Sequence, residues 1–239
     1  MAQKCCGHYP KESPSMSSLT PPHCAACPFR REERLCMTPD GKHPPDCPTA
    51  LCAAQAEACL ADYEQPEVRR MAREAAIVER ESYALRPDGM RLPCRPRILE
   101  IVAFAKAMDY RRLGLVFCIG LRAEAKETAL IFEAHGLEVV SAVCKVGRIP
   151  KTRLGLAEGQ LLCPRNPESM CNPLLQARLM NEAQVELNVL LGLCVGHDTL
   201  ALRQLKAPTT VLAVKDRMLG HNPLAALYSG YFAYLKKPV

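Results

Sequence analysis

The feature that most constrains the fold is a series of four short apolar runs that alternate with helical patterns. The runs cover residues 113–119, 137–144, 187–193 and 210–214. Apolar runs of this length that alternate with helices predict a buried parallel sheet with right-handed crossovers. We therefore expect an α/β domain with a small, doubly wound, mainly parallel, Rossmann-like sheet. Its strands should follow an order near 2-1-3-4.

Helical patterns occupy the connections between the runs and the region before them. Asn172 and Asn222 each precede a proline, which is the pairing of an N-cap residue with a good first helical residue. Residues 145–170 form a polar connection whose length is typical of a functional or mobile loop. A turn is expected at 86–89. The predicted helices cover residues 63–85, 96–109, 121–135 and 173–183, a short stretch after 198, and 223–235.

Cysteine and proline dominate the segment before the first helix. Residues 1–23 are rich in Pro, Ser, Lys and His and are expected to be a disordered tail. Proline is so dense in the cysteine-rich segment 24–62 that long helices or strands are not expected there. Such a segment buries too little apolar surface to fold unaided, and a metal ion supplies the missing cross-link. Residues 63–239 then make up the α/β domain with its two leading helices.

The proposed ligands of this N-terminal metal are four cysteines in the pattern C-x2-C-x8-C-x10-C. Two thiolates two residues apart can bind one ion from a tight turn, and a zinc ion or an iron–sulfur centre is expected. The open alternatives are Cys52, Cys59, His23 and His43, or reduced cysteines in a flexible segment. The four proposed ligands are Cys24, Cys27, Cys36 and Cys47.

The chain contains 14 cysteines, which suits either a secreted disulfide protein or an intracellular metal-binding protein. Its first residues lack the apolar segment of a signal peptide, and no run reaches the ~18 apolar residues that cross a membrane. We expect a cytoplasmic protein without membrane contact, in which clustered cysteines bind metal. The net charge of +6 is spread along the chain without a dense basic block, so nucleic-acid binding is not expected.

A second group of cysteines stands where the apolar runs end. Cys118, Cys144 and Cys194 close three of the runs, and Cys171 precedes a predicted helix start, where the helix dipole stabilises a thiolate. Parallel strands end at one edge of a sheet, where ligands bind. We therefore expect these four cysteines to hold a [4Fe–4S] cluster or a zinc ion. Cys163 is the alternative to Cys171, and free cysteines are also often buried only as small apolar residues.

Polar side chains follow the same strand ends. His197 and Asp198 come soon after Cys194, Lys215 ends the last run, and His221 precedes the final helix. They would supply acid–base groups and a cation beside a metal, and we expect them to face a small-molecule ligand or a redox partner. Each also has a local interpretation, such as a helix cap for Asp198 or a solvated side chain for Lys215.

Three motifs are distinctive: C-N-P at 171–173, G-L-C-V-G-H-D at 192–198, and K-D-R-x-L-x-H-N-P at 215–223. With them the chain resembles a cysteine-rich prokaryotic family usually labelled as metal-binding proteins or as a domain of unknown function. The resemblance covers residues 113–147 and 170–228 and reaches the N-terminal C-x2-C and the Cys47-Pro48 pair. The resemblance implies metal binding but no particular enzymatic reaction. The chain departs from the family in its long tail, its wider Cys27–Cys36 spacing, and its additional Cys52, Cys59 and Cys94.

Three functions follow from these observations. The first is a metal-binding protein with a redox or Lewis-acid site at the sheet edge. The second is a non-enzymatic module that senses metal or redox state through its cysteines. The third is an α/β domain with a zinc staple and inert buried cysteines.

Overall fold

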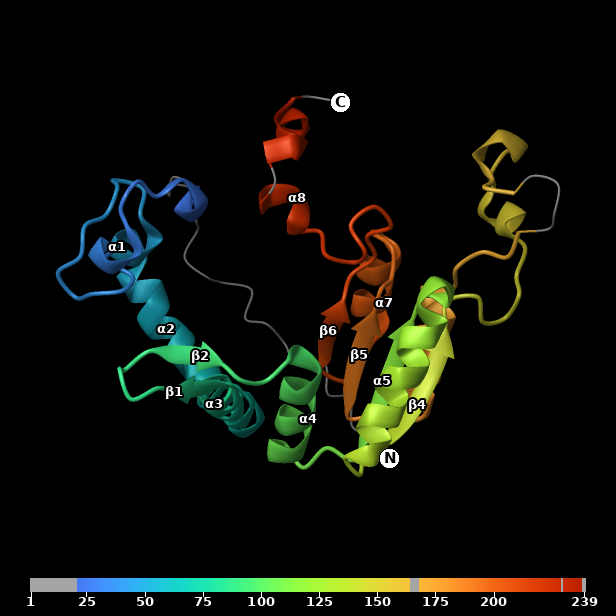
Figure 1. Cartoon of the computed structure of the whole chain (residues 1–239), viewed down its shortest axis with the longest axis horizontal. Coiled ribbons are helices and arrows are strands. Elements are labelled where there is room, and N and C mark those ends of the chain that lie inside the picture. Colours follow the sequence, from blue (N-terminus) through green and yellow to red (C-terminus); the bar gives the residue numbers. More distant parts are fainter. Residues whose placement is uncertain (1–20, 164–167, 229, 238–239) are drawn as a thin grey trace. The chain divides into compact units, whose positions relative to one another are not determined.

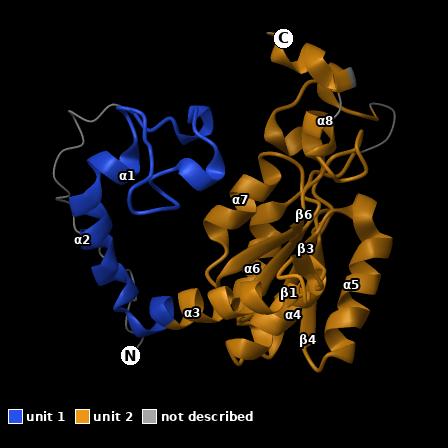
Figure 2. Ribbon diagram, turned by 60° about the vertical axis from the view of Figure 1, so that its left-hand side comes forward, with its two compact units in different colours: residues 1–69 blue, residues 70–239 orange. Residues whose placement is uncertain are grey.

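The structure is a computed structural model that describes residues 21–163, 168–228 and 230–237. Most of the predicted tail, residues 1–20, therefore lies outside the described residues. The chain divides into two compact units, residues 1–69 and 70–239 (Figure 2). In the described part of the chain, every helix is too short or too polar to cross a membrane.

The centre of the second unit is a four-stranded parallel sheet (Figure 1). Its strands lie in the order β4-β3-β5-β6. Leu113 of β3 is paired with both Val139 of β4 and Leu187 of β5, and Asn188 of β5 is paired with Thr209 of β6. The α/β class and the parallel sheet are thus confirmed. The strands are β3 (Arg112–Phe117), β4 (Glu138–Val143), β5 (Leu187–Leu191) and β6 (Thr209–Ala213).

The two central strands carry the core of this unit. Every residue of β5 is buried, as are the four middle residues of β3. The outer strands β4 and β6 are mostly half-buried. Burial on both faces explains why the central strands are continuous apolar runs in the sequence.

Helices cover both faces of the sheet. Helix α6 packs closely against Gly114 of β3, where an added Cβ would lie only 2.8 Å from the Met180 Sδ atom. Leu115, the next residue of β3, lines a groove together with Ala125 of α5. Neighbouring residues of a strand point to opposite faces, so α5 and α6 lie on different faces of β3. The α-helices that lie wholly within this unit are α4 (Arg97–Ala107), α5 (Arg122–Ala134), α6 (Pro173–Glu182), α7 (His197–Gln204) and α8 (Ala225–Tyr228).

The start of α6 forms as the sequence predicts. The Asn172 side chain is the N-cap, and its Oδ1 atom accepts a hydrogen bond from the Leu175 backbone N–H at 3.1 Å. Pro173 is the first helical residue, where a missing N–H costs nothing. The end of the preceding segment, which includes Cys171, is thereby held in one place.

Three predictions of local structure are wrong. The helix expected over 63–85 is α3 (Pro66–Glu81) and ends early, because the residues after it pair across the 86–89 turn as strands β1 (Tyr83–Leu85) and β2 (Arg91–Pro93). The helix expected over 223–235 is divided into α8 and the 3-10 helix η7 (Gly230–Lys236), which begins at a glycine. The cysteine-rich segment contains the eleven-residue helix α2 (Ala53–Tyr63), because its stretch after Pro48 is rich in alanine and free of proline.

The first unit has little apolar core. None of its described residues, 21–69, is buried. Its chain is shaped by short hydrogen-bonded turns and by a bridge that pairs Arg34 with Lys42. Besides α2, its elements are the 3-10 helices η2 (Cys24–Ala26) and η3 (Arg31–Glu33) and the short helix α1 (Pro48–Leu51).

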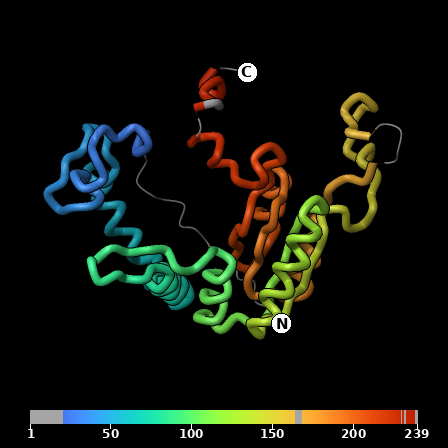
Figure 3. The backbone as a smooth tube through the Cα atoms, in the orientation of Figure 1, coloured from blue at the N-terminus to red at the C-terminus, as the bar shows by residue number. Residues whose placement is uncertain are grey.

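A long excursion leaves the sheet after β4 and returns to it at the start of α6 (Figure 3). It contains the short helices η5 (Lys151–Leu154) and η6 (Glu158–Gln160). A bridge between Pro150 and Ser169 closes its base, and Lys151 pairs with Glu168 at 3.0 Å. The excursion corresponds to the polar connection expected over 145–170, and Cys163 lies exposed within it.

Candidate functional site

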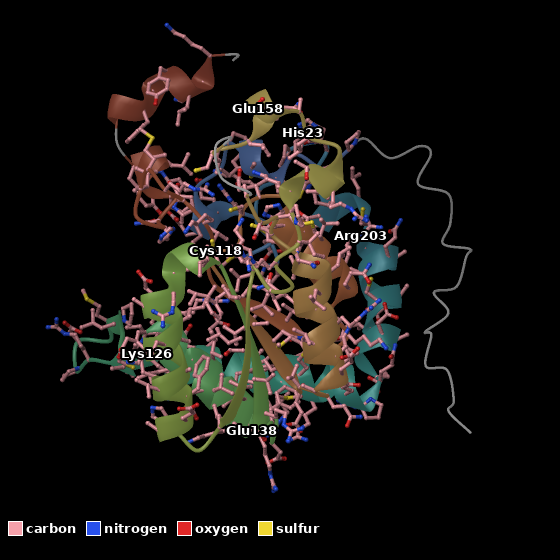
Figure 4. The ribbon with its side chains drawn as sticks, turned by 90° about the vertical axis from the view of Figure 1, so that its right-hand side faces the viewer. His23, Cys118, Lys126, Glu138, Glu158 and Arg203 are labelled. Atoms are coloured by element: carbon pink, nitrogen blue, oxygen red, sulfur yellow. The ribbon has the colours of Figure 1, made fainter. Side chains whose placement is uncertain are left out.

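Cys118 and Cys144 stand at the carboxyl end of the sheet, immediately after β3 and β4. The Cys144 N–H donates to Phe117 O at 2.9 Å, and the Cys118 N–H donates to Leu191 O at 3.1 Å. These bonds continue the sheet ladder by one residue, so the backbone fixes both cysteines. Both side chains are buried. Figure 4 shows Cys118 at one end of the strands and Glu138, the first residue of β4, at the other.

Cys171 reaches the same edge from the excursion. The backbone N–H of the next residue, Asn172, donates to Cys144 O at 2.7 Å. This bond brings the Cys171 sulfur to 3.8 Å from the Cys144 sulfur. The buried Gln176 fixes α6 to the strand ends, because its Nε2 atom donates to Phe117 O at 3.1 Å and to Ala142 O at 2.7 Å.

Cys194 lies three residues beyond the end of β5 and has other partners. Its sulfur accepts a hydrogen bond from Arg217 Nη2 at 3.0 Å. Its carbonyl oxygen accepts from the N–H groups of His197 and Asp198, which begin α7. Of the four edge thiols, namely Cys118, Cys144, Cys171 and Cys194, the structure therefore joins Cys144 directly to Cys171 and holds Cys194 at the neighbouring strand end.

The two thiols in contact have opposite pKa shifts. The hydrogen bond with Cys144 and the positive charges of Lys145 and His197 lower the pKa of Cys171 to about 5, although partial burial opposes this. The same hydrogen bond and burial raise the pKa of Cys144, and the nearby Cys118 adds to the rise. Cys144 therefore keeps the shared proton, and Cys171 is the thiolate of the pair. The Ile119 backbone N–H also donates to the Cys144 sulfur, at 3.3 Å.

The other four predicted site residues are placed differently. Lys215 lies over Gly120, where an added Cβ would be 2.8 Å from its Nζ atom and 3.9 Å from the Cys118 sulfur. His197 is close enough to Cys171 to act on its pKa. Asp198 accepts from the Thr199 N–H at 2.7 Å within its own helix.

His221 belongs to a closed local loop. Its Nδ1 atom accepts from the Asp216 N–H at 3.1 Å, and its own N–H donates to Asp216 O at 2.9 Å. The residue has a positive φ of 67°, which this tight turn requires. His221 thus shapes the segment that carries Lys215 and Arg217, and its hydrogen bonds are made with Asp216 rather than with the edge thiols.

The thiols suit a soft metal chemically, and their spacing can be compared with known coordination. Two thiolates on a tetrahedral zinc ion lie about 3.8 Å apart, because each Zn–S bond is about 2.3 Å long. The Cys144–Cys171 separation is the same. Within the described residues, however, no group of three or more His, Cys, Asp or Glu side chains is arranged to hold one metal ion. A single ion would therefore have to draw further thiols toward this pair.

The N-terminal unit places its own four candidate ligands on the lining of one small cavity, although no three of these described side chains are arranged to hold one metal ion. The cavity has a volume of about 70 Å³, and the alternative ligand His23 also lines it. Cys24 and Cys27 are joined by a turn in which the Cys27 N–H donates to Cys24 O, and Cys47 precedes α1. The alternatives Cys52 and Cys59 are not among the lining residues. We call the four that line it, Cys24, Cys27, Cys36 and Cys47, the N-terminal thiols.

Sequence reasoning missed four residues that shape the sheet edge. Lys145 follows Cys144 directly and acts on the pKa of Cys171. Arg217 donates to the Cys194 sulfur. Gly120 makes room for Lys215, and Gln176 fixes α6. A basic residue next to a strand-end cysteine was the available signal for Lys145.

Comparison with known proteins identifies relatives of undetermined role. A family model described as "Protein of unknown function (DUF1847)" matches residues 47–212. A relative from Methanocaldococcus jannaschii, described as "Uncharacterized protein MJ0455", is 37% identical over 214 residues, which are 90% of this chain and 96% of the relative. No solved structure matches the chain.

Proposed function

Because the chain belongs to the DUF1847 family of proteins of unknown function, we propose a role for it from its own site: it is a metal-binding protein with two thiolate centres. The edge thiols hold an iron–sulfur cluster or a zinc ion at the carboxyl end of the sheet. The N-terminal thiols hold a structural zinc or iron–sulfur centre. We also infer that the sheet is doubly wound and Rossmann-like, which the strand order and the placement of α5 and α6 support.

The observation that carries the proposal is the meeting of Cys144 and Cys171 at the strand ends. The two sulfurs are 3.8 Å apart, the separation that two thiolate ligands of a tetrahedral zinc ion would have, and the pKa of Cys171 is lowered, which supports the proposal. The remaining edge thiols stand at two other strand ends. A cluster takes one thiolate on each iron and so spans a wider set of ligands than a single ion does, which favours iron–sulfur if all four bind.

The residues around the thiols have definite tasks in this proposal. A bound centre supplies Lewis acidity, and electron storage as well if it contains iron. Cys171 is ready to bind as a thiolate, whereas Cys144 must lose its proton, so that metal binding releases a proton. The positive charges of Lys145, Lys215 and Arg217 offset the negative charge that several thiolates would gather.

The unit formed by residues 1–69 lacks an apolar core among its described residues, and this supports the proposal of an N-terminal metal centre. With none of residues 21–69 buried, apolar packing contributes little to its stability. Its N-terminal thiols face a cavity of about 70 Å³, which has room for one ion. Small segments without a core are commonly stabilised by a metal.

The test is anaerobic purification of the full chain with an absorption spectrum and counts of iron, sulfide and zinc. We expect metal in the wild-type protein, loss of the edge centre alone in Cys171→Ser, and loss of the N-terminal centre alone in Cys24→Ser. Cys94→Ser, which changes an exposed cysteine outside both groups, is the matched control. Wild-type protein that carries neither zinc nor iron would overturn the proposal. A colourless protein with one zinc, lost in Cys24→Ser only, would leave a zinc-stapled domain with inert edge cysteines.

A second candidate function is a dithiol switch without metal. It is favoured by the contact of Cys144 with Cys171 and by the low pKa of the latter. The Cys171 thiolate would attack an oxidant disulfide such as oxidised glutathione and release one glutathione. Cys144 would then attack the resulting mixed disulfide and displace the second glutathione. One S–S bond forms in the protein while one breaks in the oxidant, two electrons reduce the two glutathione sulfurs, and the single proton of the thiol–thiolate pair leaves with one released glutathione. Metal-free wild-type protein that loses two hydrogens on oxidation, whereas Cys171→Ser does not, would favour this function.

A further inference from the structure

Three cationic side chains converge on the edge thiols from the segments that follow β4 and β6. Lys145 follows Cys144 and donates to the carbonyl oxygen of Ser169, two residues before Cys171. Lys215 lies over Gly120 beside Cys118, and Arg217 donates to the Cys194 sulfur. Among the described residues, the ion pairs lie elsewhere and none includes these three cations. The edge therefore holds positive charge that no carboxylate of the described chain pairs with.

The two carboxylates that follow the same strand ends are already engaged by backbone groups. Asp198 accepts from the Thr199 N–H at 2.7 Å. Asp216 accepts from the N–H groups of Met218 and Leu219 at 3.0 and 2.8 Å. Each carboxylate thus orders its own segment. Lys145 Nζ donates to the Ser169 carbonyl oxygen and Arg217 Nη2 donates to the Cys194 sulfur, so these bonds hold two of the cations at the edge while their remaining N–H donors can still reach a ligand.

Gly120 shows that the position of Lys215 is built into the fold. The Lys215 ammonium occupies the place where a side chain at this residue would begin, 2.8 Å from an ideal Cβ. The Cys118 sulfur lies 3.9 Å from the same point. Any larger residue at 120 would push the ammonium away from the thiol.

We propose that the sheet edge binds a small anionic substrate, whose carboxylate or phosphate group lies among Lys145, Lys215 and Arg217 while its reacting part faces the edge thiols. The proposal rests on the proposed function and adds the substrate class to it. Ligands of open α/β sheets bind at this edge, and unpaired cations in such a place attract oxyanions. Arg217 offers a planar donor group and the two lysines offer point charges, which together suit an oxyanion.

The test compares an anionic with a neutral alkylating reagent on full-length protein that has been reduced and stripped of metal under anaerobic conditions. Iodoacetate and iodoacetamide both form an S–C bond and release iodide, so both depend equally on the thiolate fraction. Their rate ratio therefore reports the local charge alone. Peptide mass spectrometry follows Cys171, with the exposed Cys94 as internal reference.

We expect the iodoacetate-to-iodoacetamide ratio to be higher at Cys171 than at Cys94. Lys215→Gln should lower that ratio by a factor on the order of two to three, as expected when one unit charge is removed from the edge in water. Gly120→Ala should lower it as well by displacing the ammonium. Lys206→Gln is the matched control, because Lys206 precedes β6 and Lys215 follows it. Equal ratios at Cys171 and Cys94, or a ratio unchanged in Lys215→Gln, would overturn the anion site.

Competition identifies the oxyanion. Protection of Cys171 from iodoacetate by inorganic phosphate, but not by acetate at the same ionic strength, supports a phosphate group, and the reverse supports a carboxylate. Protection by neither at concentrations that leave Cys94 unaffected counts against the proposal. Metal counts on untreated protein separate the two proposals: metal without a charge effect overturns only the anion site, and a charge effect without metal overturns only the metal centre.

Discussion

At the residue scale, the edge pair shows how two identical side chains acquire different chemistry. Cys144 is buried and its sulfur accepts a backbone N–H, whereas Cys171 is half-buried and lies near Lys145 and His197. The pair shares one proton, so its titration belongs to both sulfurs together. The first thiolate forms on Cys171 because the hydrogen bond with Cys144 and the nearby positive charge stabilise it there, although partial burial opposes this.

Because Cys171 ionises before Cys144, we expect an unusual pH dependence of Cys171 alkylation in metal-free protein. A lowered pKa of about 5 means that the thiolate persists at neutral pH and is lost only as the pH falls through that value. The rate with neutral iodoacetamide should therefore stay flat across neutral pH and decline in mild acid. Lys145→Met should move the midpoint upward, because it removes a charge that lowers the pKa.

The exposed Cys94 is the internal reference for that titration. A midpoint for Cys171 that coincides with that of Cys94 would contradict the assignment of the thiolate.

At the element scale, local patterns predicted most of the fold. The four strands and helices α4 to α7 lie within a few residues of their expected positions, because each has its own periodicity and caps. The hairpin of β1 and β2 was missed because its strands are stabilised by pairing across a turn, which a helical period in the preceding residues obscured. The strand-end positions of Cys118 and Cys144 follow from topology. The charges of Lys145 and Arg217 were missed because basic residues at strand ends are usually solvated.

Helix α6 places Cys171, and Gln176 links that helix to two strands. Gln176→Leu should remove the bonds to Phe117 O and Ala142 O and leave those carbonyl groups with fewer partners. We expect a loss of about 1–3 kcal/mol in the free energy of unfolding, measured by urea denaturation. The Cys171 midpoint in the alkylation experiment should also rise as its contact with Cys144 loosens.

Arg178→Leu, a change at an exposed position on the same helix, is the control for Gln176→Leu. Similar losses of stability in the two variants, with no change at Cys171, would show that Gln176 does not position the thiol.

At the scale of the whole molecule, the two units differ in what stabilises them. The unit of residues 70–239 has a continuous apolar core around β3 and β5. The unit of residues 1–69 has no buried residue among those described and relies on turns and on its proposed metal. Their stabilities should therefore respond differently to the same treatment.

Removal of metal should expose this difference. We expect a chelator to make residues 24–62 sensitive to limited proteolysis while the sheet of residues 112–213 stays protected. Mass spectrometry of the fragments locates the cuts, and added zinc should restore protection. Equal protection of residues 24–62 with and without the chelator would mean that this unit does not depend on metal.

The excursion of residues 145–171 begins and ends at one hydrogen bond, from the Asn172 N–H to Cys144 O. Its two ends are anchored by the sheet and by α6, so its length is decoupled from the rest of the domain. Each doubling of such a loop costs only about 0.6 kcal/mol in closure entropy. Insertions, deletions or replacements in this stretch should therefore be tolerated. They would change which groups approach the cysteines and leave the sheet and α6 unaltered.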